Sequence, residues 1–173
     1  MNAKLLFTQV DETEFDYIFS LIQKARINSE KQKVYQWDDT YPTKELVMKD
    51  IVNGDTYLVY RDGKKVGFFV INEVCEHNDP TRIKWLNDGK FIFLHRFCID
   101  PDYQQAGLGS EVLAKIESDA QQNGAKSVKL DVFSTNAHAI YIYEKSGYKK
   151  MGEDLCNRGT FYIYEKLLPN FKF

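Results

Sequence analysis

The stretch DPDYQQAGLGS, residues 100–110, joins two segments of opposite character and decides which fold is predicted. Residues 91–99, just before it, are strongly apolar and aromatic, which indicates a buried strand. Apolar residues then recur every four positions from Leu108 to Ala120, so residues 107–123 are predicted to form a helix with one apolar face. A strand that runs into an amphipathic helix through such a turn favours a mixed α/β sandwich, with helices on both sides of one sheet.

The turn itself has the features of an anion-binding site. The first N–H groups of a helix have no partner within the helix, and the helix dipole places partial positive charge there. Gly107 and Gly109 would let a phosphate approach the backbone closely, although a plain strand–helix turn explains them equally well. Two other nucleotide loops are excluded: Val112 stands where a dinucleotide fingerprint needs its third glycine, and the Gly-Lys-Ser/Thr of a Walker loop is absent.

Helices and strands are mixed along the rest of the chain. Asp11 with Glu14 three positions later indicates a helix start, and residues 61–64 carry a hairpin-turn signal. Residues 29–42 are polar and aromatic and are predicted to form a loop. The predicted strands cover residues 4–10, 56–60, 66–73, 91–99, 127–133 and 159–167, and the predicted helices cover residues 11–26, 43–52, 107–123 and 136–146.

Composition predicts a single globular domain over residues 1–173. Hydrophobic residues make up 43% and charged residues 28%, and the formal net charge of −2 gives no general attraction to nucleic acid or anionic lipid. No apolar stretch approaches the roughly 20 residues that span a bilayer, and the N-terminus lacks a signal-peptide pattern. Cys75, Cys98 and Cys156 form neither a disulfide framework nor a metal-binding pattern. We therefore expect a cytoplasmic protein without a metal site.

Three segments resemble one enzyme family in the same order along the chain. The motif Gln104-x-x-Gly107-x-Gly109 resembles the acetyl-CoA loop of the GNAT N-acetyltransferases. The preceding LHRFCIDP, residues 94–101, is similar to the family's fourth strand. The later NAHAIYIYEKSGY, residues 136–148, is similar to its N-x-x-A-x-x-x-Y-E-K-x-G-F/Y segment.

The N-terminal third matches this family more loosely. There Gln36-Trp37, followed by Tyr41-Pro42, resembles a bacterial subgroup whose substrate the sequence does not name.

The resemblance implies a GNAT fold: a central, mostly antiparallel sheet with one parallel strand pair splayed at the acetyl-CoA site, flanked by helices. It also implies acetyl-CoA as cosubstrate. The implied cofactor contacts are the backbone of Phe97, Cys98 and Ile99 for the pantetheine arm; the loop motif residue Gln104 and the amides of Gln105, Ala106, Gly107, Leu108, Gly109 and Ser110 for the pyrophosphate; Asn136 for the CoA arm; and Tyr143 beside the thioester sulfur. Gln105 and Ala106 replace residues that are often glycine and basic in the family, so weaker CoA affinity is expected.

The chemistry of acetyl transfer assigns further roles. A lysine-like amine has a pKa of about 10.4, so its deprotonation at neutral pH corresponds to about 4.6 kcal/mol, part of which a base or a water chain must supply. A strand N–H beside Phe97 or Cys98 would stabilise the oxyanion. Tyr143 is the candidate acid for the departing thiolate, although any one of 11 tyrosines can simply be a core aromatic.

Candidates for the base and the acceptor site each have a structural alternative. His95 alternates with two phenylalanines on one strand face and is either a base in the cleft or a hydrogen-bonded structural histidine. Glu73 is a second candidate base in the substrate site. Trp37 and Tyr41 would form an acceptor wall, although packing explains these aromatics equally well.

Three further residues are predicted to have no catalytic role. Cys98 is predicted to be a small core residue rather than a nucleophile, because amine attack on a thioester needs no acyl-enzyme. His77 and His138 lie in polar surroundings and are predicted to be surface residues.

The predicted function is acetyl transfer from acetyl-CoA to a primary amine of a small molecule, by direct attack in a ternary complex. Two alternatives stay open: N-acetylation of a peptide or protein, and a non-catalytic CoA-binding regulatory module. Homodimerisation is compatible with the many aromatic residues but is not fixed by the sequence.

Overall fold

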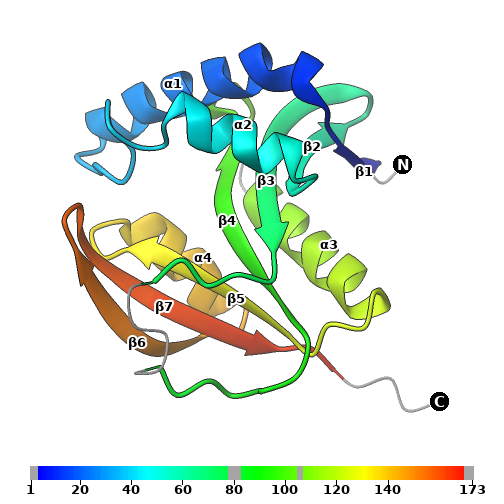
Figure 1. Ribbon diagram of the computed structural model, residues 1–173, viewed down its shortest axis with the longest axis vertical. Coiled ribbons are helices and arrows are strands. Elements are labelled where there is room, and N and C mark those ends of the chain that lie inside the picture. The colour runs from blue at the N-terminus through cyan, green and yellow to red at the C-terminus, as the bar shows by residue number, and fades with distance from the viewer. Residues whose placement is uncertain (1–3, 78–82, 105–106, 170–173) are drawn as a thin grey trace. The chain divides into compact units, whose positions relative to one another are not determined.

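The computed structural model describes residues 4–77, 83–104 and 107–169. Figure 1 shows the elements in their order along the chain. They are β1 (Leu5–Gln9), η1 (Glu12–Glu14), α1 (Phe15–Lys31), α2 (Lys44–Val52), β2 (Thr56–Arg61), β3 (Lys64–Asn72), β4 (Phe91–Ile99), η3 (Pro101–Tyr103), α3 (Leu108–Gln122), β5 (Ser127–Phe133), α4 (Ala137–Lys145), β6 (Lys149–Cys156) and β7 (Gly159–Leu167).

The strands have the mostly antiparallel arrangement that the family resemblance implies. Within the described residues they form a seven-stranded sheet in the order β1-β2-β3-β4-β5-β7-β6. The pairs β1–β2, β2–β3, β5–β7 and β6–β7 are antiparallel, whereas β4 and β5 are parallel. The α/β fold class is therefore confirmed.

Contacts divide the chain into two compact units, which share strand β4. The first unit comprises Met1–Ile71 and Arg96–Gly109, and the second comprises Asn72–His95 and Ser110–Phe173. The chain passes from the second unit to the first between His95 and Arg96. A single domain over residues 1–173 stays a prediction.

In the first unit, α1 and α2 pack on the sheet through one apolar face each. Ile18 and Ile22 of α1 and Val47 and Ile51 of α2 join Phe68 of β3 in one buried cluster. Helix α1 continues five residues past the predicted end at residue 26. The prediction stopped too early because the last turns of the helix are mostly polar and lack the apolar repeat. Periodicity of apolar residues cannot detect such an extension.

The turn between β2 and β3 needs two residues with positive φ, which Asp62 and Gly63 supply. Asp62 and Gly63 both have positive φ, 51° and 78°, as a two-residue hairpin turn of the favoured twist requires. The hairpin predicted at residues 61–64 is confirmed.

In the second unit, α3 buries Val112, Ile116 and Ala120, which belong to the predicted four-residue repeat, and also Leu113, which does not. The bounds of β4, β5 and β7 equal those predicted from the sequence. Strand β6 was not predicted. It pairs with β7 alone in the strand order, and its side chains are mostly exposed or half-buried, so its sequence lacks the alternation that burial on one face imposes.

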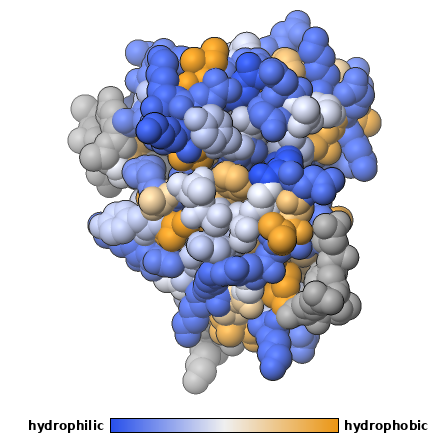
Figure 2. All heavy atoms as spheres, turned by 90° about the vertical axis from the view of Figure 1, so that its left-hand side faces the viewer, coloured by the Kyte–Doolittle hydropathy of each residue, from blue (hydrophilic) through white to orange (hydrophobic). Residues whose placement is uncertain are grey.

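The surface carries separate apolar side chains. On the face shown in Figure 2, apolar residues lie scattered among hydrophilic ones. No helix among residues 4–77, 83–104 and 107–169 has the length and apolar character needed to cross a membrane.

Candidate functional site

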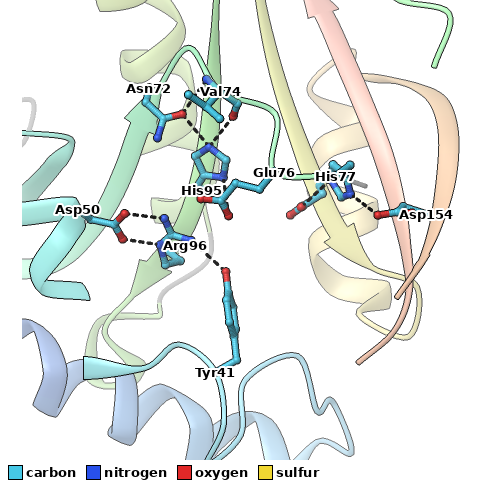
Figure 3. Close-up of polar contacts among 10 residues, drawn as sticks. Tyr41, Asp50, Asn72, Val74, Glu76, His77, His95, Arg96 and Asp154 are labelled. Atoms are coloured by element: carbon cyan, nitrogen blue, oxygen red, sulfur yellow. Dashed lines mark hydrogen bonds and ion pairs between the residues drawn. The ribbon is translucent and has the colours of Figure 1, made fainter. Parts of the chain in front are cut away.

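Strand β4 changes its backbone conformation at Arg96. Its φ of 46° lies in the left-handed region, which costs a residue with a side chain about 1–2 kcal/mol. The guanidinium group, 2% exposed, forms a two-point contact with Asp50 of α2: Nε lies 2.8 Å from Oδ2, and Nη2 donates to Oδ1 at 2.8 Å. Nη1 donates to the Tyr41 hydroxyl at 2.9 Å (Figure 3). These contacts hold the strained residue immediately before Phe97, Cys98 and Ile99.

Sequence reasoning missed both Arg96 and Asp50. A signal was present, because each is a charged residue in an otherwise apolar pattern. Asp50 lies between the buried Val47 and Ile51 on one face of α2, and Arg96 lies in the apolar run that forms β4. Two opposite charges at apolar positions indicate a buried pair, since an unpaired charge is rarely buried.

The two aromatic residues proposed for the acceptor site lie in the first unit, but their surroundings differ. The Trp37 ring stacks on Phe68 with centroids 6.4 Å apart, and it packs against the core of this unit. Tyr41 instead points its hydroxyl at Arg96. Packing thus accounts for the position of Trp37, whereas Tyr41 has a polar contact with β4. An acceptor role for either residue stays a prediction.

His95 is buried and hydrogen-bonded within the second unit. Its Nε2 lies 3.0 Å from Asn72 Oδ1 and 3.1 Å from the Val74 carbonyl, and its ring stacks on Phe93 at 4.5 Å (Figure 3). Two acceptors around Nε2 mean that this nitrogen carries the hydrogen, so only Nδ1 is left as the basic atom. Nδ1 lies 3.9 Å from Glu76 Oε2. Glu73, the other candidate base, is exposed.

The prediction that His77 is a surface residue is wrong. Its side chain is 7% exposed, with Nδ1 2.8 Å from Asp154 Oδ2 (Figure 3). Its Nε2 lies 2.9 Å from Asp131 Oδ2. Burial lowers its pKa, but the hydrogen bonds and charges of the two carboxylates outweigh burial and raise the pKa above the ordinary value. The partners lie on β5 and β6, far away in sequence, so the polar residues around His77 did not reveal them. His138 is exposed, as predicted.

The turn after β4 is fixed by its own backbone and side chains. Asp100 Oδ1 accepts from the Asp102 N–H at 2.9 Å, and the Asp100 N–H donates to the Val66 carbonyl at 2.9 Å. The Gln104 side-chain amide donates to the Ile99 carbonyl at 3.2 Å. These contacts set where the loop begins.

The glycine of the loop faces open space. Gly107 has φ of 96°, and a Cβ built on it would meet no atom within 4 Å. Helix α3 begins at the next residue, Leu108, with Gly109 and Ser110 in its first turn. Gln105 and Ala106, which the resemblance assigns to the pyrophosphate, lie outside the described residues.

Cys98 belongs to the core of the first unit, as predicted. Its thiol is buried, and burial together with the negative charge of Asp100 raises its pKa to about 12. A thiol in this state is a poor nucleophile at neutral pH, because the thiolate is the reactive form.

Helix α4 positions the two residues that the third motif assigns. Asn136 caps the helix, its Oδ1 accepting from the Ala139 N–H at 3.1 Å. Tyr143 is the buried residue of α4, and its ring meets Tyr148 edge-on at 5.8 Å. Burial, and then the charge of Asp131, raises the pKa of Tyr143, so the phenol is protonated at neutral pH. Contacts to CoA stay predictions for both residues.

The family model for the acetyltransferase (GNAT) family matches residues 18–148. The chain belongs to the GNAT acetyltransferase family. This match includes the loop, the strand before it and the α4 segment, the three motifs on which the resemblance was based.

Individual relatives and solved structures share a third or less of their aligned residues with this chain. The chain is 33% identical over 96 residues to the spermine/spermidine N(1)-acetyltransferase of Bacillus subtilis strain 168, a match that covers 55% of this chain and 59% of that protein. A GNAT-family acetyltransferase from Streptococcus agalactiae has the same fold, with a TM-score of 0.81 at 23% identity over 96% of both chains. PaiA N-acetyltransferase from Thermoplasma acidophilum, solved in complex with coenzyme A, gives a TM-score of 0.66 at 16% identity, covering 95% of this chain and 99% of that one.

Asp50→Ala should destabilise the protein strongly, because it leaves the Arg96 charge buried and unpaired. We expect the free energy of unfolding to fall by about 3–5 kcal/mol, measured by urea denaturation. The matched control is Asp39→Ala, which removes the exposed partner of Arg26 and should cost less than about 1 kcal/mol. Equal losses for the two variants would contradict the buried-pair assignment.

His77 should make stability depend on pH. Its folded-state pKa is raised, so its stabilising contribution is complete below the unfolded value of about 6.5 and is lost as the pH rises through the folded pKa. Between about pH 6 and about pH 9, the wild type should lose more unfolding free energy than His77→Gln. His138→Gln, at an exposed histidine, should behave like the wild type. The same loss in His77→Gln and wild type would show that the contact with the carboxylates carries no charge-dependent stability.

Proposed function

We propose that the chain transfers the acetyl group of acetyl-CoA to a primary amine of a small molecule, by direct attack of the amine on the thioester. The observation that carries this proposal is the turn from β4 to α3 in a member of the GNAT family. Gly107, with its positive φ and open space at the Cβ position, stands directly before the first turn of α3. A phosphate can approach such a backbone, and the helix amides there favour an anion.

The strand before the turn supports the same cofactor. The register of β4 with β5 runs from Phe91 to Leu94, whereas β4 continues to Ile99. The backbone of Phe97, Cys98 and Ile99 is assigned to the pantetheine arm by resemblance. Phe97–Ile99 follow the change in strand conformation at Arg96. This change supports a role for their backbone other than regular pairing within the sheet. A solved structure of the same fold, PaiA N-acetyltransferase, contains coenzyme A.

Tyr143 supplies a donor for the leaving thiolate. Its raised pKa keeps the hydroxyl protonated throughout the neutral range, so it can hydrogen-bond to sulfur as negative charge develops there. The bond from sulfur to the acetyl carbon breaks as the amine nitrogen forms its bond to that carbon, and the departing thiolate takes the hydroxyl proton of Tyr143, which solvent then replaces. The amine must lose its own proton, for which Glu73, His95 Nδ1 and a water chain are the candidates.

Polyamines are the first acceptors to test, because the Bacillus subtilis relative is named for spermine and spermidine. An assay with peptides beside small amines separates the alternative of protein N-acetylation. A protein that binds CoA without releasing it from acetyl-CoA would be the non-catalytic module. Homodimerisation and a cytoplasmic location stay predictions.

Tyr143→Phe should reduce kcat by about 10²–10⁴, because the leaving thiolate loses its donor. Acetyl-CoA affinity should stay within about twofold, since the ring and its packing are kept. CoA release is followed with a thiol reagent and spermidine as acceptor. Tyr141→Phe, at a 60% exposed tyrosine of the same helix, is the control and should keep the wild-type kcat. An unchanged kcat in Tyr143→Phe would remove the phenol from the mechanism.

Gly107→Ala should weaken acetyl-CoA binding by at least about tenfold, because the new methyl group occupies the space proposed for the pyrophosphate. Gly124→Ala is a matched control: Gly124 also has positive φ, 86°, and open space at the Cβ position, but it follows α3. Both changes carry the same backbone strain of about 1–2 kcal/mol, so only their difference reports on binding. Calorimetric titration with acetyl-CoA measures the affinity of each variant. Equal acetyl-CoA affinities in the two variants would place the cofactor elsewhere.

A further inference from the structure

Three charges meet where β4 ends. The Nζ atom of Lys24, on α1, lies 2.6 Å from Asp100 Oδ1 and 2.5 Å from Asp102 Oδ2. The Asp100 side chain is only 12% exposed, whereas those of Lys24 and Asp102 are 40% and 71% exposed. The hydrogen bonds to Asp100 and then to Asp102 raise the pKa of Lys24, so the ammonium keeps its proton at neutral pH.

The loop segment has no cationic side chain of its own. Residues 100–110 contain two carboxylates and no lysine or arginine, so the segment proposed to hold a pyrophosphate carries two negative charges of its own. Those charges would repel an anionic ligand, and the repulsion would extend over about a Debye length. Amides and a helix dipole supply only partial positive charge to oppose it.

Lys24 is not required to hold the turn in place. The Asp100 N–H donates to the Val66 carbonyl, Asp100 Oδ1 accepts from the Asp102 N–H, and the Tyr103 N–H donates to the Asp100 carbonyl at 2.8 Å. These bonds fix the turn through its backbone and one carboxylate. Removing the ammonium therefore changes the charge of the turn more than its shape.

We propose that Lys24 is the charge partner that makes this turn compatible with a bound pyrophosphate, by offsetting one of the two negative charges of Asp100 and Asp102. This inference rests on the proposed function, in which the loop that follows the turn binds acetyl-CoA. Lys24 stands 76 positions before Asp100 and contributes from α1 the positive charge that the loop segment lacks. It acts through the two carboxylates and is a positioning residue, with no part in the chemical step.

The test measures CoA affinity by calorimetry at low ionic strength in four variants. Lys24→Met should bind CoA about fivefold more weakly, and Lys24→Arg should bind like the wild type. Asp102→Asn should bind at least as tightly as the wild type, because it removes a repelling charge. Lys24→Met combined with Asp102→Asn should recover most of the lost affinity. These differences should shrink at high salt, since exposed charges are screened.

Lys115→Met is the matched control, because Lys115 pairs with Asp119 at 2.9 Å on α3 and should leave CoA affinity unchanged. Wild-type affinity in Lys24→Met overturns the proposal, as does a double variant that stays as weak as Lys24→Met. Loss of CoA binding by Lys24→Met, in a protein that binds CoA but acetylates no amine, supports the charge role and overturns the proposed function. A wild type that binds no CoA overturns both.

Discussion

The ion pair between Arg96 and Asp50 is the constraint on which the first unit depends. Each charge is buried, and neither would be tolerated without the other, because an unpaired buried ion loses several kcal/mol of hydration. The pair also explains a backbone conformation that would otherwise be unfavourable. Arg96 adopts φ of 46° because its guanidinium group is fixed by Asp50 of α2 and by the Tyr41 hydroxyl at the same time. A helix, a strand and a loop are joined at one planar group, which is the geometry that arginine provides and lysine does not.

Strain of this kind concentrates near functional sites, where a chain needs a local geometry that regular structure does not supply. In β4 it stands immediately before the residues assigned by resemblance to the pantetheine arm. Gly67, opposite in β3, shows how little room remains there: a Cβ at that position would lie 2.4 Å from the Cys98 carbonyl oxygen. The close approach of Gly67 to Cys98 fixes the backbone of β4. The ion pair with Asp50 fixes the side chain of Arg96. The position of Phe97–Ile99 is thus set by packing rather than by a ligand.

The sequence predicted those parts of the fold in which burial imposes a pattern. Strands β4, β5 and β7 have apolar residues at positions set by packing, so their bounds followed directly, whereas β6 is too exposed to carry such a pattern. The site divides in the same way. Tyr143 and Asn136 could be named because a motif carries them, but Asp50, Arg96, His77 and Lys24 act through partners between 46 and 78 positions away. A pattern read along the chain can mark a charge at an apolar position, as at Asp50 and Arg96, but the fold is needed to show which partner each charge contacts.

The two ligands of the proposed reaction carry opposite charges. A CoA pyrophosphate is an anion, whereas an unreacted amine acceptor arrives as a cation that must give up a proton. A chain with a formal net charge of −2 attracts neither ligand strongly, so each must be accommodated by charges close to where it binds. The carboxylates after β4 would serve a cation better than an anion if they stood alone. With Lys24 between them the formal charge of the turn falls from −2 to −1, which leaves less repulsion for the partial positive charges of the α3 amides to overcome when an anion binds.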